Sequence, residues 1–372
     1  MIETYGHKNI HVRTYAEVQK VSGSIGDFQV EVLQKARFVH EDKCTGCGAC
    51  MEKCPKKVPS EYEMGLADRR AIYFPFAQAV PRVATVDKDA CLHFKTGKCL
   101  LCVKECQTGA IDHKMEDQVV TVNVGAIIVT TGFDVYMPDE MEEYGYGRFE
   151  NVVTAMEFER IINAAGPTHG HLQRLSEDKG RPKRLAFIQC VGARDVRHDR
   201  PYCCAVCCMH STKEAMLARE HYDDIESVIF YKDMRACAKG FFEYVERAKR
   251  DYGVRYVNSD ATVQENPDTK NPVVVYDVGG RQQSEEFDLV VLATTLVPRK
   301  ESLEVAKMLG VKADEFGFLE SSDHVLDPCR TIIPGVYLAG YAAGPADIPE
   351  SVAQGSSAAA KAVEALVQTG GA

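Results

Sequence analysis

Four cysteines between residues 44 and 55 follow the spacing C-x2-C-x2-C-x3-C-P. They are Cys44, Cys47, Cys50 and Cys54. This spacing is typical of polypeptides that bind a [4Fe–4S] cluster, because three thiolates three residues apart can surround one cluster if the backbone curls around it. Gly46 and Gly48 permit that close approach. A structural zinc site is the alternative, but such sites usually combine separated C-x2-C pairs. The run therefore predicts an iron–sulfur cluster.

A second group of four cysteines has the spacing C-x7-C-x2-C-x3-C. Its members are Cys91, Cys99, Cys102 and Cys106. In two-cluster ferredoxins the fourth cysteine of each run serves the other cluster. We therefore expect one cluster on Cys44, Cys47, Cys50 and Cys106, and a second on Cys91, Cys99, Cys102 and Cys54. The alternative is that the second group is a degenerate site that no longer binds metal, but all four of its cysteines are retained, which argues against this.

The segments outside residues 40–115 read as alternating strands and helices, which predicts an α/β fold. Two apolar stretches, 121–132 and 288–298, are expected to be buried strands. A third, 335–349, reads as a strand, a glycine turn and an acidic residue, followed by an alanine-rich helix from Glu350 to about Leu366.

The order of these stretches resembles that of two-dinucleotide-domain flavoproteins such as thioredoxin reductase. In that family the last helix points its N-terminus at the flavin. The resemblance places Asp347 and the amides of Ile348 to Val352, with Ser351 among them, at the flavin. It also implies that Gly132 and Gly340 form the turns beside it. The alternative is that any buried parallel strand is apolar and ends in glycine.

The G-x-G-x-x-G loop that binds the pyrophosphate in such enzymes does not occur in this sequence. The first residues instead read as a strand and a hairpin, well inside such a domain. We therefore expect the first dinucleotide-binding βαβ unit to belong to a separate chain, as in a split gene, or to a longer protein of which this sequence is a fragment.

A third group of five cysteines lies between residues 190 and 208. It follows a predicted strand, in R-L-A-F-I-Q-C-V-G-A-R-D, and precedes a predicted helix, in P-Y-C-C-A-V-C-C-M-H. Thiols at a helix N-terminus ionise readily and ligate metal. These residues resemble the signature of the A subunit of heterodisulfide reductase, and the resemblance runs from about Tyr5 to Leu366. It includes the seven-residue gap of the second group.

That resemblance implies a third [4Fe–4S] site and a flavin contact. The implied ligands are Cys190, Cys203, Cys207 and Cys208. Cys204 falls where relatives usually have serine, so it is expected not to be a ligand. Lys213 matches a helix lysine near the flavin N5 atom, although an exposed helix lysine is the alternative. Cys237 and Cys329 stand alone and are expected to be packing residues.

The composition of the chain indicates the cellular compartment and the kinds of partner to expect. The chain has 372 residues, a formal net charge of −10 and 15 cysteines. This negative net charge does not indicate the positively charged surface with which proteins bind nucleic acid. No apolar run of 18 residues predicts a membrane span, and the N-terminus lacks the apolar core of a signal peptide. We therefore expect a cytoplasmic protein, whose clustered cysteines bind metal rather than form disulfides.

The expected organisation is a flavoprotein frame interrupted by a ferredoxin. The fold class predicted is α/β, a two-dinucleotide-domain flavoprotein of the thioredoxin reductase type with an inserted α+β two-cluster ferredoxin domain. The expected segments are 1–38, 116–180 and 297–372 for the FAD domain, 39–115 for the ferredoxin domain, and 181–296 for an NAD-domain-like region with the third site.

The resemblance implies an iron–sulfur flavoprotein that passes electrons, and can bifurcate them, between a donor subunit, FAD and the clusters. Its implied partners are B- and C-type subunits of heterodisulfide reductase, or subunits of hydrogenase or formate dehydrogenase type. One alternative is the A-type subunit of a quinone-interacting or aromatic-ring reductase complex. Another is a truncated, non-catalytic iron–sulfur protein without flavin.

Overall fold

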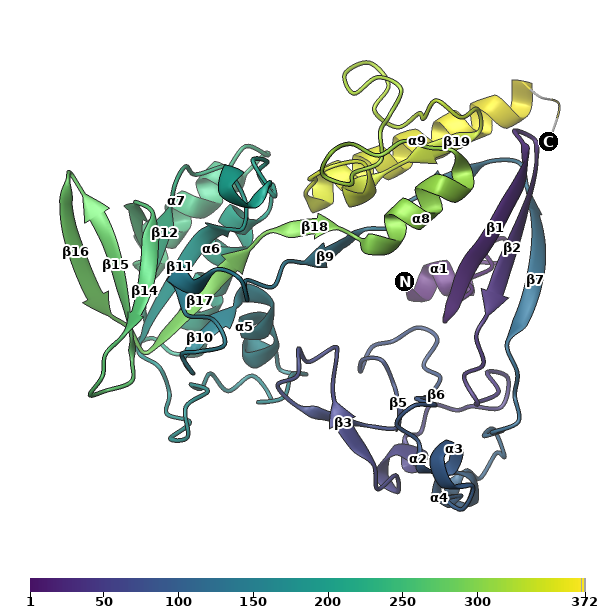
Figure 1. Ribbon diagram of the computed structural model, residues 1–372, viewed down its shortest axis with the longest axis horizontal. Helices are drawn as coiled ribbons and strands as arrows, with labels where there is room; N and C mark the ends of the chain where they lie inside the picture. The colour runs from purple at the N-terminus through teal and green to yellow at the C-terminus, as the bar shows by residue number, and fades with distance from the viewer. Residues whose placement is uncertain (369, 371–372) are drawn as a thin grey trace. The chain divides into compact units, whose positions relative to one another are not determined.

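Two compact units make up the chain, Met1–Gly125 and Ala126–Ala372. The structure is a computed structural model and describes residues 1–368 and 370 (Figure 1). No helix of these residues is long and apolar enough to cross a membrane. The boundary between the units falls at Gly125, inside the stretch 121–132 that the sequence suggested was one strand. Two strands occupy it instead, one in each unit.

The first unit contains a three-stranded antiparallel sheet in the order β1-β2-β7. A short helix, α1 (Ile2–Gly6), precedes it. The hairpin predicted near the N-terminus is present as β1 (Ala16–Ser24) and β2 (Asp27–Gln34). Strand β7 (Gln118–Val124) pairs with β2 along its length, so that Gln34 lies opposite Gln118. Everything between β2 and β7 is therefore inserted into one strand pair.

The insertion is built from short elements around its own apolar core. That core is closed by an isolated bridge between Val39 and Ile111, near the two ends of the insertion. The cysteines of the first two groups are distributed over its helices and loops. Its helices and strands are α2 (Ala49–Glu52), β3 (Lys57–Pro59), β4 (Asp68–Arg70), β5 (Ile72–Tyr73), β6 (Thr85–Val86), α3 (Leu92–Thr96) and α4 (Leu101–Glu105).

The second unit is organised by a five-stranded parallel sheet in the order β10-β17-β11-β12-β13. The adjacent strands β17 and β11 are mostly apolar and almost wholly buried, as expected for a parallel sheet covered on both faces. The strands are β10 (Val152–Thr154), β11 (Arg184–Val191), β12 (Glu226–Tyr231), β13 (Arg255–Asn258) and β17 (Leu289–Thr294).

Helices and a small antiparallel sheet complete the body around these strands. Three helices follow strands of the parallel sheet: α5 (Ala155–Ile162), α6 (Cys207–His221) and α7 (Phe241–Tyr252). Two 3-10 turns lie at Glu142–Tyr144 and Val196–His198. The antiparallel sheet consists of β14 (Ala261–Glu265), β15 (Pro272–Val278) and β16 (Arg281–Glu286).

Two antiparallel connections, β9 (Phe133–Val135) and β18 (Leu296–Pro298), lead from this body to a smaller part of the same unit (Figure 1). There β8 (Ile127–Val129) and β19 (Val336–Leu338) form a parallel pair. The remaining elements of this part are α8 (Lys300–Leu309), a 3-10 turn at Gly340–Ala342, and α9 (Ile348–Gln368).

The predicted class, α/β with an inserted cysteine-rich module, is thus confirmed. The stretch 288–298 is divided into β17 and β18, because the chain leaves the parallel sheet at Thr295 to pair with β9. The last helix begins at Ile348, two residues before the predicted start.

Candidate cofactor sites

The first two cysteine groups share the small core of the insertion. Most of these eight side chains pack against it only partly buried, while Cys91 is 8% exposed. Gly46 and Gly48 both have positive φ, +68° and +84°. A Cβ on Gly46 would lie 2.8 Å from the carbonyl oxygen of Arg82, so the curl at this position requires glycine.

The thiols of the first group lie close to one another and to thiols of the second group. Burial, and after it the neighbouring sulfurs of Cys102, Cys44, Cys47 and Cys106, raises the pKa of the Cys50 thiol to about 12. Three of these four belong with Cys50 in the first expected set. Crowded thiolates need a compensating positive charge, which a metal cluster supplies.

The second expected set converges in the same way. Burial is the largest cause that raises the pKa of Cys102, to about 11, and the sulfurs of Cys91, Cys54 and Cys99 contribute to the rise. All four line one small pocket, together with apolar side chains such as Ile72 and Val86. A thiol-lined apolar pocket fits an iron–sulfur cluster. Among the residues described, no three His, Cys, Asp or Glu side chains form a group suited to a single metal ion.

The third cysteine group lies where β11 ends and α6 begins. Cys190, near the end of β11, has a positive φ of 60°, which is unusual for a residue other than glycine. Cys207 and Cys208 occupy the first turn of α6. The thiols of Cys190, Cys204 and Cys208 lie around the Cys207 thiol, and Cys207, as a hydrogen-bond donor, is the largest cause that lowers the pKa of each of the three.

Within this group Cys203 and Cys204 differ from each other in their burial. Cys204, which the family resemblance excludes as a ligand, is fully buried among the other sulfurs. Cys203 is only partly buried, and its sulfur accepts a hydrogen bond from the amide of Ala205 at 3.4 Å. Cys329 is 1% exposed, as expected for a packing residue, whereas Cys237 is exposed, so the prediction that it packs in the interior is wrong.

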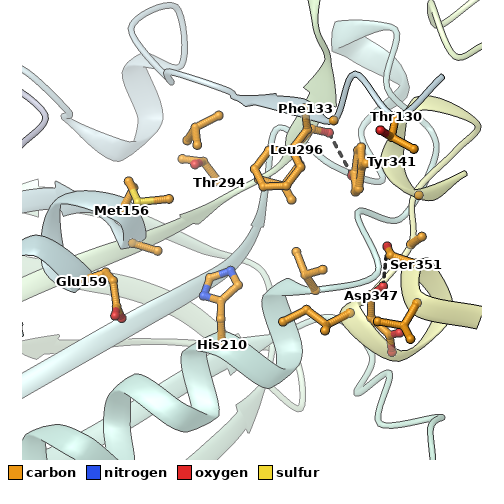
Figure 2. A pocket seen from close by; sticks show the side chains of 18 of the residues that line it. Thr130, Phe133, Met156, Glu159, His210, Thr294, Leu296, Tyr341, Asp347 and Ser351 are labelled. Atoms are coloured by element: carbon orange, nitrogen blue, oxygen red, sulfur yellow. Dashed lines mark hydrogen bonds between the residues drawn. The ribbon is translucent and has the colours of Figure 1, made fainter. Parts of the chain in front are cut away.

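A cavity of about 660 Å³ lies beside the third group, within the second unit (Figure 2). It is of the size of a typical cofactor pocket, and its walls are mainly apolar. Most of the residues predicted to contact flavin line it, although they come from three separate stretches of sequence; Pro349 and Glu350 do not. The residues that line it are Gly132, Lys213, Gly340, Asp347, Ile348, Ser351 and Val352.

The turns and the helix end at this cavity are locally well defined. Gly132 and Gly340 have φ of +76° and +65°, which side chains other than glycine rarely adopt. Asp347 and Glu350 cap α9 reciprocally, each side chain accepting from the other residue's amide at 2.8–3.0 Å. Ser351 donates from its hydroxyl and its amide to the Asp347 carbonyl.

Fewer amides are therefore available at this helix end than the sequence suggested. The amides of Glu350 and Ser351 already have partners, and Pro349 has no N–H. The expected row of donors from Ile348 to Val352 is reduced at these three positions. The Asp347 side chain remains at the cavity, which suits a polar contact to a ligand hydroxyl better than phosphate binding.

Charged residues that the sequence did not single out form one wall of the cavity. Glu159 of α5 pairs with Lys213 of α6. His210 and Glu214 lie one turn apart on α6, with Nδ1 and Oε1 separated by 3.7 Å. His210 Nδ1 and Glu214 Oε2 are buried without a hydrogen-bond partner. Figure 2 shows His210 and Glu159 on this wall. Buried polar atoms of this kind are available to a ligand.

Burial is also the largest influence on the ionisation of this pair. It raises the pKa of Glu214. It tends to lower the pKa of His210, but the adjacent Glu214 carboxyl group outweighs it and leaves that pKa raised. The i, i+4 spacing of the two residues was a usable signal in the sequence. The sequence contains no comparable signal for Glu159, because this residue reaches Lys213 only through tertiary packing.

The cavity and the third cysteine group adjoin each other. Helix α6 carries Cys208 in its first turn and Lys213 five residues later, about 7.5 Å along the axis. Tyr341 lines the cavity, and its hydroxyl donates to the carbonyls of Cys204 and Leu296 at 3.3 and 3.2 Å. Its ring contacts Phe133 with the centroids 5.2 Å apart. A ring cofactor in the cavity would therefore be separated from the sulfurs by only a few side chains.

Residues 38–60 match the family described as "4Fe-4S binding domain". The whole chain is similar to curated proteins of methanogens. It is 44% identical over 370 residues to the A subunit of the "H(2):CoB-CoM heterodisulfide,ferredoxin reductase" of Methanothermobacter thermautotrophicus, a match that covers 99% of this chain and 55% of that protein. It is 47% identical over 369 residues to the second iron-sulfur A subunit of the "CoB--CoM heterodisulfide reductase" of Methanopyrus kandleri, covering 98% and 55%.

The chain thus spans about half the length of the curated relatives it matches. Likeness to solved structures is weaker. The Lactococcus lactis thioredoxin reductase is 17% identical, with a TM-score of 0.41 over 80% of this chain and 86% of that one. Sequence identity above 40% along nearly the whole chain, with a 4Fe-4S domain in the expected place, settles the relationship. Over the part that it spans, the chain belongs to the family of the heterodisulfide reductase A subunits.

Proposed function

We propose that this chain is an electron-transfer component of a reductase complex of the heterodisulfide reductase type. It would bind FAD in the cavity of the second unit and three [4Fe–4S] clusters at the three cysteine groups. Electrons from a donor subunit would reach the flavin and leave through the clusters. A cytoplasmic location, B- and C-type or hydrogenase- or formate dehydrogenase-type partner subunits, and a partner chain that carries the glycine fingerprint belong to the same proposal.

One observation carries it: helix α6 bears Cys207 and Cys208 of the third group in its first turn, and His210, Lys213 and Glu214 at the wall of the cavity. An electron-transfer protein must hold its redox groups close together and tune each one, and a single rigid helix does this. FAD, when bound, supplies the change from two-electron to one-electron transfer. The chain's own contribution is to keep Lys213 and Glu159 paired beside the ring, and to exclude water with apolar walls.

The proposed cofactor content can be measured directly. Each cluster contains four iron atoms, so three predict about twelve per chain. Flavin should be assayed by fluorescence after acid precipitation, because the clusters mask its absorbance. The chain should be tested alone and co-purified with the products of neighbouring genes.

Two outcomes would contradict the proposal in different ways. Iron of about eight atoms per chain would remove one cluster. Absence of flavin even in the native complex would remove the flavoprotein function and favour the alternative, an iron–sulfur protein without flavin. Cys237→Ser and Cys329→Ser are matched controls that should leave the iron content unchanged, since neither residue belongs to an expected ligand set.

A further inference from the structure

Two histidine rings stack beside the second cysteine set of the insertion. The rings of His93 and His113 have centroids 4.1 Å apart and an interplanar angle of 20°. Phe94 meets both of them edge-on, at 5.7 and 5.5 Å, and itself packs on Phe38 at 4.6 Å. The histidine pair is therefore held in position by the core of the insertion.

Each ring directs one nitrogen at a cysteine of the second set. His93 Nδ1 lies 3.0 Å from the carbonyl oxygen of Cys99. A carbonyl only accepts, so this nitrogen carries the proton. His113 Nε2 lies 4.0 Å from Cys102 Sγ, at the long end of the range for a bond to sulfur. A cysteine that ligates a cluster is a thiolate and only accepts, so Nε2 directs an N–H at it.

We propose that His113, supported by His93, donates a hydrogen bond to the Cys102 sulfur and thereby raises the reduction potential of the second cluster. The proposal rests on the proposed function, since it requires that cluster. A reduced cluster carries one more negative charge than an oxidised one, and an N–H donor binds the more negative sulfur more strongly. Hydrogen bonds to the sulfurs are one of the established controls on cluster potential.

The first cysteine set receives different donors. Cys106 Sγ contacts the amide of Ala110 at 3.3 Å and the hydroxyl of Thr108 at 3.6 Å. Neither contact involves a histidine, so the first cluster provides an internal reference within the same molecule. The proposal also gives a role to the seven-residue gap between Cys91 and Cys99, because α3 in that gap places His93 on His113.

The test is a redox titration of the full chain, followed by electron paramagnetic resonance, in three variants. His113→Phe keeps an aromatic ring on His93 but has no donor. At a fixed potential it should lower the reduced-to-oxidised ratio of one cluster about tenfold, a fall of about 59 mV for one electron. The other clusters should be unchanged. His113→Gln retains an amide N–H near the position of Nε2 and should restore most of the potential.

His93→Phe separates the hydrogen bond from ring packing. It removes the bond to the Cys99 carbonyl but leaves the His113 N–H in place, so it should shift the same cluster much less than His113→Phe. Equal shifts in the two variants, a shift of every cluster, or no shift in His113→Phe would each overturn the proposal. If His113→Phe loses iron, His113→Gln and His113→Asn repeat the comparison, since only glutamine reaches the sulfur. Equal potentials in those two would also overturn it.

Iron content distinguishes this inference from the proposed function. If the Cys102→Ser variant contains as much iron as the wild-type chain, the second cysteine set holds no cluster, and the proposed cofactor content fails. If Cys102→Ser contains about four iron atoms fewer than the wild-type chain, but His113→Phe does not shift the cluster potential, the proposed function stands and only the role of His113 fails.

Discussion

At the scale of single residues, the Lys213–Glu159 pair is expected to set the flavin's potential. The ammonium group lies at the cavity, and a positive charge beside a flavin stabilises its reduced, anionic form. Lys213→Met should keep the flavin but lower its reduced-to-oxidised ratio at fixed potential about tenfold, about 30 mV for two electrons. A redox titration measures this.

The control for that variant is Lys249→Met. Lys249 forms a comparable ion pair with Glu246, but on the exposed side of α7. Its loss should leave the flavin potential unchanged. If both variants shift the potential alike, net charge rather than the position of Lys213 is responsible, and the assignment of Lys213 to the flavin fails.

The neighbouring cysteines Cys203 and Cys204 can be separated by exchange for serine. The family resemblance implies serine at the second position, so Cys204→Ser should keep about twelve iron atoms per chain, and Cys203→Ser about eight. Iron analysis and the spectrum of the third cluster decide between them. The reverse result would mean that the buried Cys204 ligates the cluster in this chain and that the family pattern does not apply here.

At the scale of elements, the start of α5 supports one wall of the cavity. Thr154 is fully buried, and its hydroxyl accepts from the Glu157 amide at 3.2 Å while Glu157 accepts from the Thr154 amide at 2.6 Å. Thr154→Ala should destabilise the fold by about 1–2 kcal/mol. A lower urea midpoint is the expected result. Thr154→Ser keeps the hydroxyl, so its free energy of unfolding should fall less than that of Thr154→Ala. An equal fall in both variants would mean that the loss of the methyl group causes the effect.

The sequence predicted different elements with unequal success, and the reasons are physical. The inserted cysteine-rich module and the last helix were readily predicted, because cysteine spacing and helix-forming composition are local properties of the sequence. The division of 121–132 and 288–298 was not, because an apolar run does not show where the chain leaves one sheet for another. Glu159 and the His93–His113 pair were also missed, since long-range packing brings each to its partner.

At the scale of the whole molecule, the two units are expected to depend differently on metal. The insertion has helices of four or five residues and strands of two or three, and cysteines form part of its core. The second unit has a five-stranded sheet in which β17 is fully buried and β11 almost fully buried. Removal of the clusters should therefore unfold the insertion first, because metal binding supplies much of its folding free energy.

Limited proteolysis of the chain before and after iron chelation measures this difference. New cuts should appear between about residues 40 and 115, and a fragment that contains residues 184–294 should persist. Equal loss of both regions would show that the sheet also depends on the clusters. No new cuts would show that the insertion is stable without metal.

The pairing of β2 with β7 has a consequence for how such a protein could arise. Gln34 and Gln118 face each other across the ladder, and the Asp117 side chain accepts from the Ala36 amide at 2.8 Å. The two ends of the insertion thus meet at a spacing that a tight turn could bridge. A gene could gain or lose the entire electron-carrying cassette at this junction while the receiving sheet kept its register, so ancestry of the cassette and of its host need not be the same.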